Sequence, residues 1–141
     1  MDSGAGAPVA NPADFPGCTV TDSPRSLAGP VYIGPGNEKI PNEGQFKLPM
    51  RLDDGRMIES TYQAAKVRKP LMAVSSVNDK GNIVIFEEKG SFIFPGRNKE
   101  LINQMRSLIQ KFTDKVKLHR KNGVFHMKAW KLKPGFTRQG R

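Results

Sequence analysis

The residues of this chain with the clearest potential for chemistry are Asp2-Ser3-Gly4, next to its first residue. Two Asp carboxyls in contact share one proton, because both cannot ionise together, and such a pair activates a water molecule. A neighbouring hydroxyl orients the pair by a hydrogen bond, and glycine lets the backbone turn closely beneath it. Taken alone, however, the tripeptide is more typical of a disordered chain end. Its meaning therefore depends on the rest of the sequence.

Three other sets of residues have weaker chemical potential. Asp53-Asp54-Gly55 is typical of a hairpin turn, in which adjacent carboxylates point apart and form no catalytic pair. Gly34-Pro35-Gly36 lacks the Lys-Ser/Thr of a phosphate-binding loop and precedes no predicted helix. Cys18 is the single cysteine, which excludes an internal disulfide and favours a small hydrophobic side chain over a catalytic thiol.

Alternating apolar and polar residues predict a mainly β fold for residues 1–96. Phe46, Leu48, Met50 and Leu52 share one face of a strand over 45–52, which turns at 53–55 and returns over 57–65. Residues 6–30 are predicted as loop with one short strand around 18–20. Further elements are expected at 31–33, 71–74 (a strand buried on both faces), 75–80 (a helical turn), 82–86 and 91–94.

Residues 97–141 are predicted as a separate extension of one helix, one hairpin and a tail. Asn98 caps an amphipathic helix whose apolar stripe is predicted to contact the core, with a groove for a partner protein as the alternative. Asn122-Gly123 predicts a hairpin over 116–130 that sets His119 opposite His126. No third ligand is in view, so we expect a solvated pair and no metal. The stripe consists of Leu101, Ile102, Met105, Leu108, Ile109 and Phe112.

The net charge of +10 belongs entirely to the extension. Residues 1–97 hold 11 Lys/Arg and 11 Asp/Glu, whereas residues 98–141 hold 12 Lys/Arg against Glu100 and Asp114. This asymmetry indicates a boundary near residue 96. No apolar run reaches membrane-spanning length and no signal-peptide pattern is present. The sequence therefore predicts an intracellular, cytoplasmic protein without membrane contact.

Taken in order, these features resemble the retropepsin-like aspartic proteases of retroviruses and Gag-Pol retrotransposons, in particular the copia-like branch. The active-site loop is matched by residues 2–5 and the flap by residues 32–40. The apolar segment beneath the loop is matched by Pro70-Leu71-Met72-Ala73-Val74-Ser75, and the following strand by residues 81–86. The match covers about residues 1–94, with Ala73 where the family usually has glycine. The family's strands before the active-site loop are missing, since only Met1 precedes Asp2.

The resemblance implies a half-barrel acid-protease fold and a homodimer to which each chain gives one Asp. Asp2, Ser3 and Gly4 would form the catalytic loop, and Leu71, Met72 and Ala73 would support it. The activity would be hydrolysis of a polypeptide by an Asp-activated water, without cofactor or metal. Substrate would lie under the flap residues Ile33, Gly34, Pro35, Gly36 and Asn37.

A second interpretation comes from the extension. Its cations are interleaved with Phe125, Trp130 and Phe136, which suits phosphate contact and base stacking. On this alternative the chain is a catalytically degenerate protease remnant whose residues 98–141 bind RNA or DNA. A solvated basic surface without a ligand is the simpler alternative.

Overall fold

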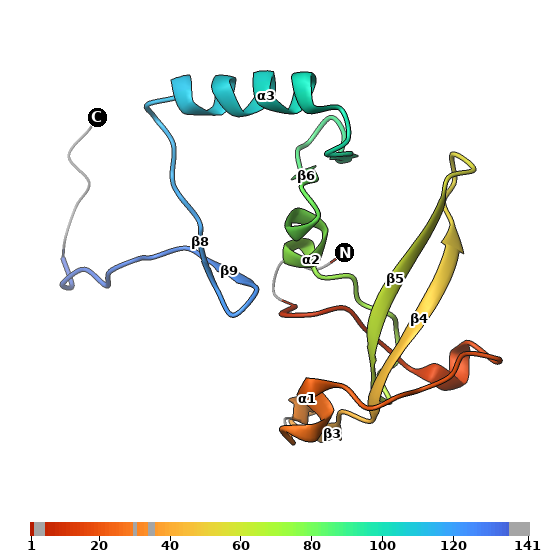
Figure 1. Ribbon diagram of the computed structural model, residues 1–141. Coiled ribbons are helices and arrows are strands. Elements are labelled where there is room, and N and C mark those ends of the chain that lie inside the picture. The colour runs from red at the N-terminus through yellow and green to blue at the C-terminus, as the bar shows by residue number, and fades with distance from the viewer. Residues whose placement is uncertain (2–4, 30, 34–35, 136–141) are drawn as a thin grey trace.

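The computed structural model of the chain describes residues 1, 5–29, 31–33 and 36–135, and the fold is mainly β (Figure 1). Its described strands form small sheets, none of which closes into a barrel. The strands are β1 (Val9–Ala10), β2 (Val31–Ile33), β3 (Lys39–Pro41), β4 (Gly44–Arg51), β5 (Met57–Ala64), β6 (Ile83–Ile85), β7 (Phe92–Phe94), β8 (His119–Lys121) and β9 (Val124–His126). The helices are a 3₁₀ turn (Pro12–Asp14), α1 (Pro24–Leu27), α2 (Val74–Asp79) and α3 (Lys99–Lys111).

A long antiparallel ribbon of β4 and β5 is the centre of the fold, as the alternating pattern predicts. Its register runs from the pair Gly44↔Ala64 to the pair Arg51↔Met57, and the chain reverses at 53–55. Gly55 has φ +85°, a conformation that suits glycine in this turn. Pro49 fits because β4 is an edge strand of its sheet.

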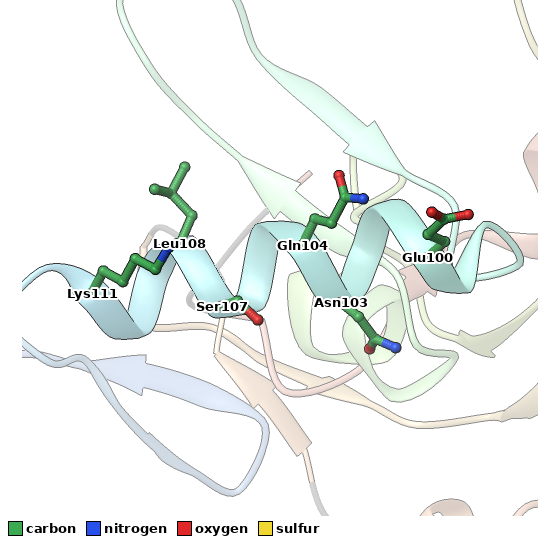
Figure 2. Close-up of a pocket in the computed structure, with 6 residues that line it drawn as sticks. All are labelled: Glu100, Asn103, Gln104, Ser107, Leu108 and Lys111. Carbon is green, nitrogen blue, oxygen red and sulfur yellow. The ribbon is translucent and has the colours of Figure 1, made fainter.

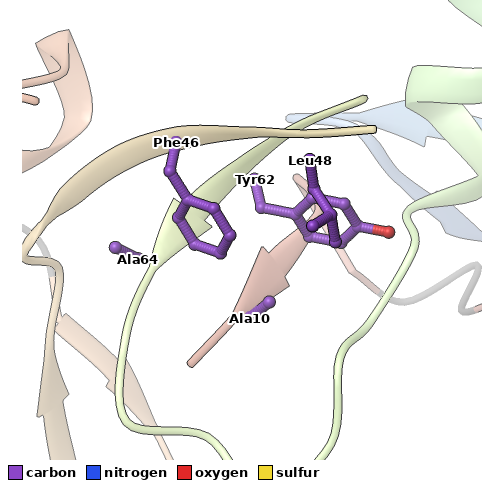
Figure 3. Close-up of a cluster of buried hydrophobic side chains, with 5 residues drawn as sticks. All are labelled: Ala10, Phe46, Leu48, Tyr62 and Ala64. Atoms are coloured by element: carbon purple, nitrogen blue, oxygen red, sulfur yellow. The ribbon is translucent and has the colours of Figure 1, made fainter. Parts of the chain in front are cut away.

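The hydrophobic core lies on one face of this ribbon, where β1 joins it (Figure 3). β1 runs parallel to β5, with Val9 beside Gln63 and Ala10 beside Ala64. The ring of Phe46 lies 6.1 Å from those of Phe15 and Tyr62, measured between centroids. The sequence analysis missed β1, because two apolar residues among Pro, Ala and Gly show no periodicity. The buried cluster consists of Ala10, Phe46, Leu48, Tyr62 and Ala64.

Two predictions about short strands were wrong, and one short helix was missed. No strand forms around 18–20; the chain makes an isolated bridge at Thr21 to Gln45 instead. The strand expected over 71–74 is reduced to local bridging, because α2 begins at Val74. The helix α1 was not foreseen, although Ser23 caps it and Pro24 occupies its first position.

The α3 helix forms as predicted, but its apolar stripe does not contact a core. Asn98 Oδ1 accepts a hydrogen bond from Leu101 N, which is the expected cap. Of the stripe, Ile102 is buried and Met105 half-buried, whereas Leu101, Leu108, Ile109 and Phe112 are exposed. Amphipathic spacing predicts the helix, but it does not predict which part of the fold, if any, packs against the apolar face.

Candidate active site

The predicted catalytic residues Asp2, Ser3 and Gly4 lie outside the described residues. The structure does describe the chain that leaves this loop, which is hydrogen-bonded along both edges. On one edge Gln63 N donates to Pro8 O at 2.9 Å, and Ala65 N donates to Ala10 O at 3.1 Å. On the other edge Val9 and Leu71 exchange two backbone hydrogen bonds, of 2.9 and 2.8 Å. Residues 8–10 are therefore held between β5 and the segment that begins at Leu71.

The predicted support segment, Leu71, Met72 and Ala73, thus lies directly beside β1. Leu71 and Met72 are half-buried, whereas Ala73 is fully buried. Ala73 is also the residue before α2, and its carbonyl accepts a hydrogen bond from Ser76 Oγ at 2.7 Å. A side chain larger than a methyl group would have to displace packed neighbours at this position.

The β8–β9 hairpin also contacts the chain near β1 and α2, which the sequence analysis did not predict. The tip of the β8–β9 hairpin packs against the chain at Gly6 and the start of α2, as Figure 1 also shows. A Cβ atom on Gly123 would lie 2.6 Å from Gly6 O and 3.1 Å from Ser75 Oγ. Because Gly123 also has φ +76°, both the turn and the contact require glycine here.

An ion pair fixes the same hairpin to the end of α2. Arg120 Nη1 and Nη2 donate to the two carboxylate oxygens of Asp79 at 2.7 and 2.9 Å. Hydrogen bonding from Arg120 holds the pKa of Asp79 below its ordinary value. The pair is exposed to solvent, so it contributes to the direction of the hairpin more than to its stability.

The predicted flap forms a hairpin of β2 and β3, with Tyr32 opposite Ile40. Ile33 is 62% exposed at the end of β2. At the tip, Gly36 N donates to Glu38 Oε2 at 2.7 Å and Asn37 has φ +62°. The other two flap residues, Gly34 and Pro35, lie outside the described residues.

A buried hydrogen-bond network connects the base of the flap to the core. Gln63 Oε1 accepts hydrogen bonds from Ser23 Oγ at 2.8 Å and from Asn42 Nδ2 at 3.0 Å. Asn42 Nδ2 also donates to the Tyr32 hydroxyl at 3.4 Å. Burial raises the pKa of Tyr32, against opposing effects of nearby Arg25 and of this hydrogen bond. Gln63 lies on a strand next to Val9, so its polar role could be found only after the strand pairing was known.

The weaker chemical candidates have structural roles or none that we can assign. Asp54 accepts a hydrogen bond from Arg56 N and forms an ion pair with its side chain, as a turn residue does. His119 lies opposite His126, as predicted. Among the described residues, no three His, Cys, Asp or Glu side chains cluster closely enough to hold a metal. Cys18 is half-buried beside the core.

Neither of two surface hollows resembles a substrate cleft. One, of about 550 Å³, is lined by side chains of α3 alone and is an open helix surface (Figure 2). The other, of about 320 Å³, lies where Gly81 and Gly96 meet the start of α3. Its lining includes four cations and no acidic residue: Lys80, Arg97, Lys99 and Arg106.

Comparison of the chain with family models, curated proteins and solved structures finds no match. Within the described part of the chain, no helix has both the length and the apolar character needed to cross a bilayer. The function is therefore argued from the residues and their contacts.

Proposed function

We propose that this chain is an aspartic endopeptidase of the retropepsin type. The observation that carries the proposal is the pairing of β1 with Leu71. The resemblance expects an apolar segment beneath the Asp-Ser-Gly loop. In support, Val9, in the chain that leaves this loop, is hydrogen-bonded to Leu71 of that segment. These segments lie about 60 residues apart in sequence, so the fold brings them together and not their position along the chain.

The proposed mechanism needs two copies of the chain, each giving one Asp2. One carboxylate, acting as general base, removes a proton from a water molecule that attacks the peptide carbonyl. The other carboxyl, still protonated, donates its proton and stabilises the tetrahedral intermediate. Ser3 orients the pair, and the hairpin of β2 and β3 closes over the extended substrate.

Two features of the structure support this arrangement. The chain that leaves the loop is hydrogen-bonded on both edges at β1, so the core holds residues 8–10 in place. The flap is connected to the same strand region by Ser23, Asn42 and Gln63. The half-barrel fold and the homodimer remain part of the proposal.

The test is cleavage of a mixed peptide library at pH 4–6 by the full chain. Asp2→Asn should abolish cleavage, because a neutral amide cannot act as the base, whereas the matched change Asp14→Asn should leave the rate within about twofold. Asp14 is exposed in the 3₁₀ turn, and its replacement by Asn removes the same charge as Asp2→Asn does. A hydroxyl-bearing transition-state mimic should inhibit the wild-type chain, and a chelator should not.

Dilution gives a second readout, because the proposed site exists only in the dimer. The specific activity should fall as the chain is diluted, because the dimer dissociates. Adding inactive Asp2→Asn chains to wild-type chains should also lower the activity, because mixed dimers hold only one Asp2. Cleavage that survives Asp2→Asn, or that is independent of concentration throughout, would contradict the proposal.

A further inference from the structure

The basic residues of the β8–β9 hairpin lie on both of its faces, and Arg120 is separated from the others. Directly opposed pairs share a face, so His119 and His126 lie on the same side as Lys121, while Arg120 and Phe125 lie on the other. Lys117 and Lys128 stand two positions outside the histidines, beyond the ends of the two strands, and both are exposed. Within the paired strands, one face therefore carries His119, His126 and Lys121 together with Val124.

The attachment of the hairpin determines which face is available. Arg120 binds Asp79, so the face that Arg120 shares with Phe125 is turned toward α2. Phe125 is half-buried, in keeping with that orientation. On the opposite face Lys121 and His126 are exposed to solvent, whereas His119 and Val124 are half-buried. Lys128, beyond the end of β9, is also exposed. The fold thus leaves Lys121, His126 and Lys128 open to solvent.

The segment that follows adds an aromatic surface to this charge. Trp130 is 86% exposed and is flanked by Lys128, Lys131 and Lys133, all of them exposed. An indole so open to water, among cations, has no role in the core. It offers a flat surface on which an unpaired base can stack.

We propose that the exposed basic side chains in and beside the β8–β9 hairpin, together with Trp130, bind single-stranded nucleic acid. The lysines contact successive phosphates, and Trp130 stacks on a base. Stacking needs an unpaired base, which favours a single strand over a duplex. This function goes beyond the proposed protease activity and does not depend on it, since none of these residues is placed in the catalytic loop or the flap.

The first test is fluorescence anisotropy of a labelled 20-nucleotide oligouridine with the full chain. The triple variant K117Q/K121Q/K128Q should bind oligouridine at least about tenfold more weakly than the wild-type chain. The plot of log K against log salt should also become less steep by about 2, which is roughly 0.7 for each lost phosphate contact. The matched control K66Q/R68Q/K69Q removes the same charge from exposed positions outside the extension. It should change affinity less than about threefold. Equal weakening by both triple variants, or no oligouridine binding at 50 mM salt, would overturn the proposal.

The second test separates base stacking from simple charge attraction. Trp130→Ala should weaken oligouridine binding by about 5-fold to 100-fold, the range found for loss of one stacked base. Trp130→Phe should restore most of the affinity. Heparin, a polyanion without bases, should bind both variants as it binds the wild-type chain. If Trp130→Ala weakens the binding of heparin and of oligouridine equally, or weakens neither, then these residues do not form a site for single strands.

Discussion

The β4–β5 ribbon and the α3 helix both have regularly spaced apolar residues, but these residues are buried in the ribbon and mostly exposed in the helix. Both form the element that the spacing predicts. In the ribbon the apolar face packs against Phe15, Cys18 and Met72, and Phe46 is only 2% exposed. In α3, Leu108 remains 57% exposed. Periodicity determines the local structure, whereas burial depends on what the fold places opposite.

Replacing one apolar side chain in each region should sharpen this contrast most strongly. Phe46→Ala should lower the free energy of unfolding by about 3–5 kcal/mol, because it removes a packed ring and leaves a cavity. Leu108→Ala should change it by no more than about 0.5 kcal/mol. Urea unfolding followed by circular dichroism measures both. Comparable losses in the two variants would mean that the stripe of α3 is covered in solution.

Two turn glycines allow a similar comparison of the hairpins. Gly55→Ala and Gly123→Ala both place a side chain at positive φ, which costs about 1–2 kcal/mol. Around Gly55 there is open space, whereas a Cβ on Gly123 would meet Gly6 O at 2.6 Å. Only Gly123→Ala should therefore release the hairpin tip, with lost hydrogen-exchange protection in residues 5–10 as well as 119–126. If residues 5–10 keep their protection in Gly123→Ala, then the contact does not hold the chain that leaves the Asp-Ser-Gly loop.

The smallest expected effect comes from acidification of the Asp79–Arg120 pair. Arg120 lowers the pKa of Asp79 below the ordinary 3.8. The stabilisation is therefore present above about pH 3.8 and is lost as the pH falls through the lower, folded-state pKa. Protection of the β8–β9 amides relative to those of β4 and β5 should decrease below that pH. Asp79→Asn should show the reduced protection already at pH 6, with no further dependence in this range.

The sequence predicted the fold best where the pairing is local. The hairpins over 44–64 and 119–126 follow from their turn residues and from alternation, and α3 follows from its cap and spacing. The strand β1 and the Gln63 network could not be predicted, since each depends on which distant segment lies alongside. The contact of the hairpin tip with Gly6 has the same cause. Of the candidate site, the strand next to Leu71 and the flap hairpin are described, whereas the role of Asp2 and the boundary at residue 96 stay predictions.

The parallel pairing of β1 with β5 also determines an order of folding. Val9 can join Gln63 only after the loop between them closes, at an entropic cost near 3.5 kcal/mol from (3/2)RT ln n for about 54 residues. The β4–β5 hairpin needs only a short turn and can form first. During synthesis, both edges of β1 can therefore be paired only after Leu71 has left the ribosome. Any shorter nascent chain lacks Leu71, which is the partner of Val9, so β1 is paired on both edges only after the centre of the protein has been made.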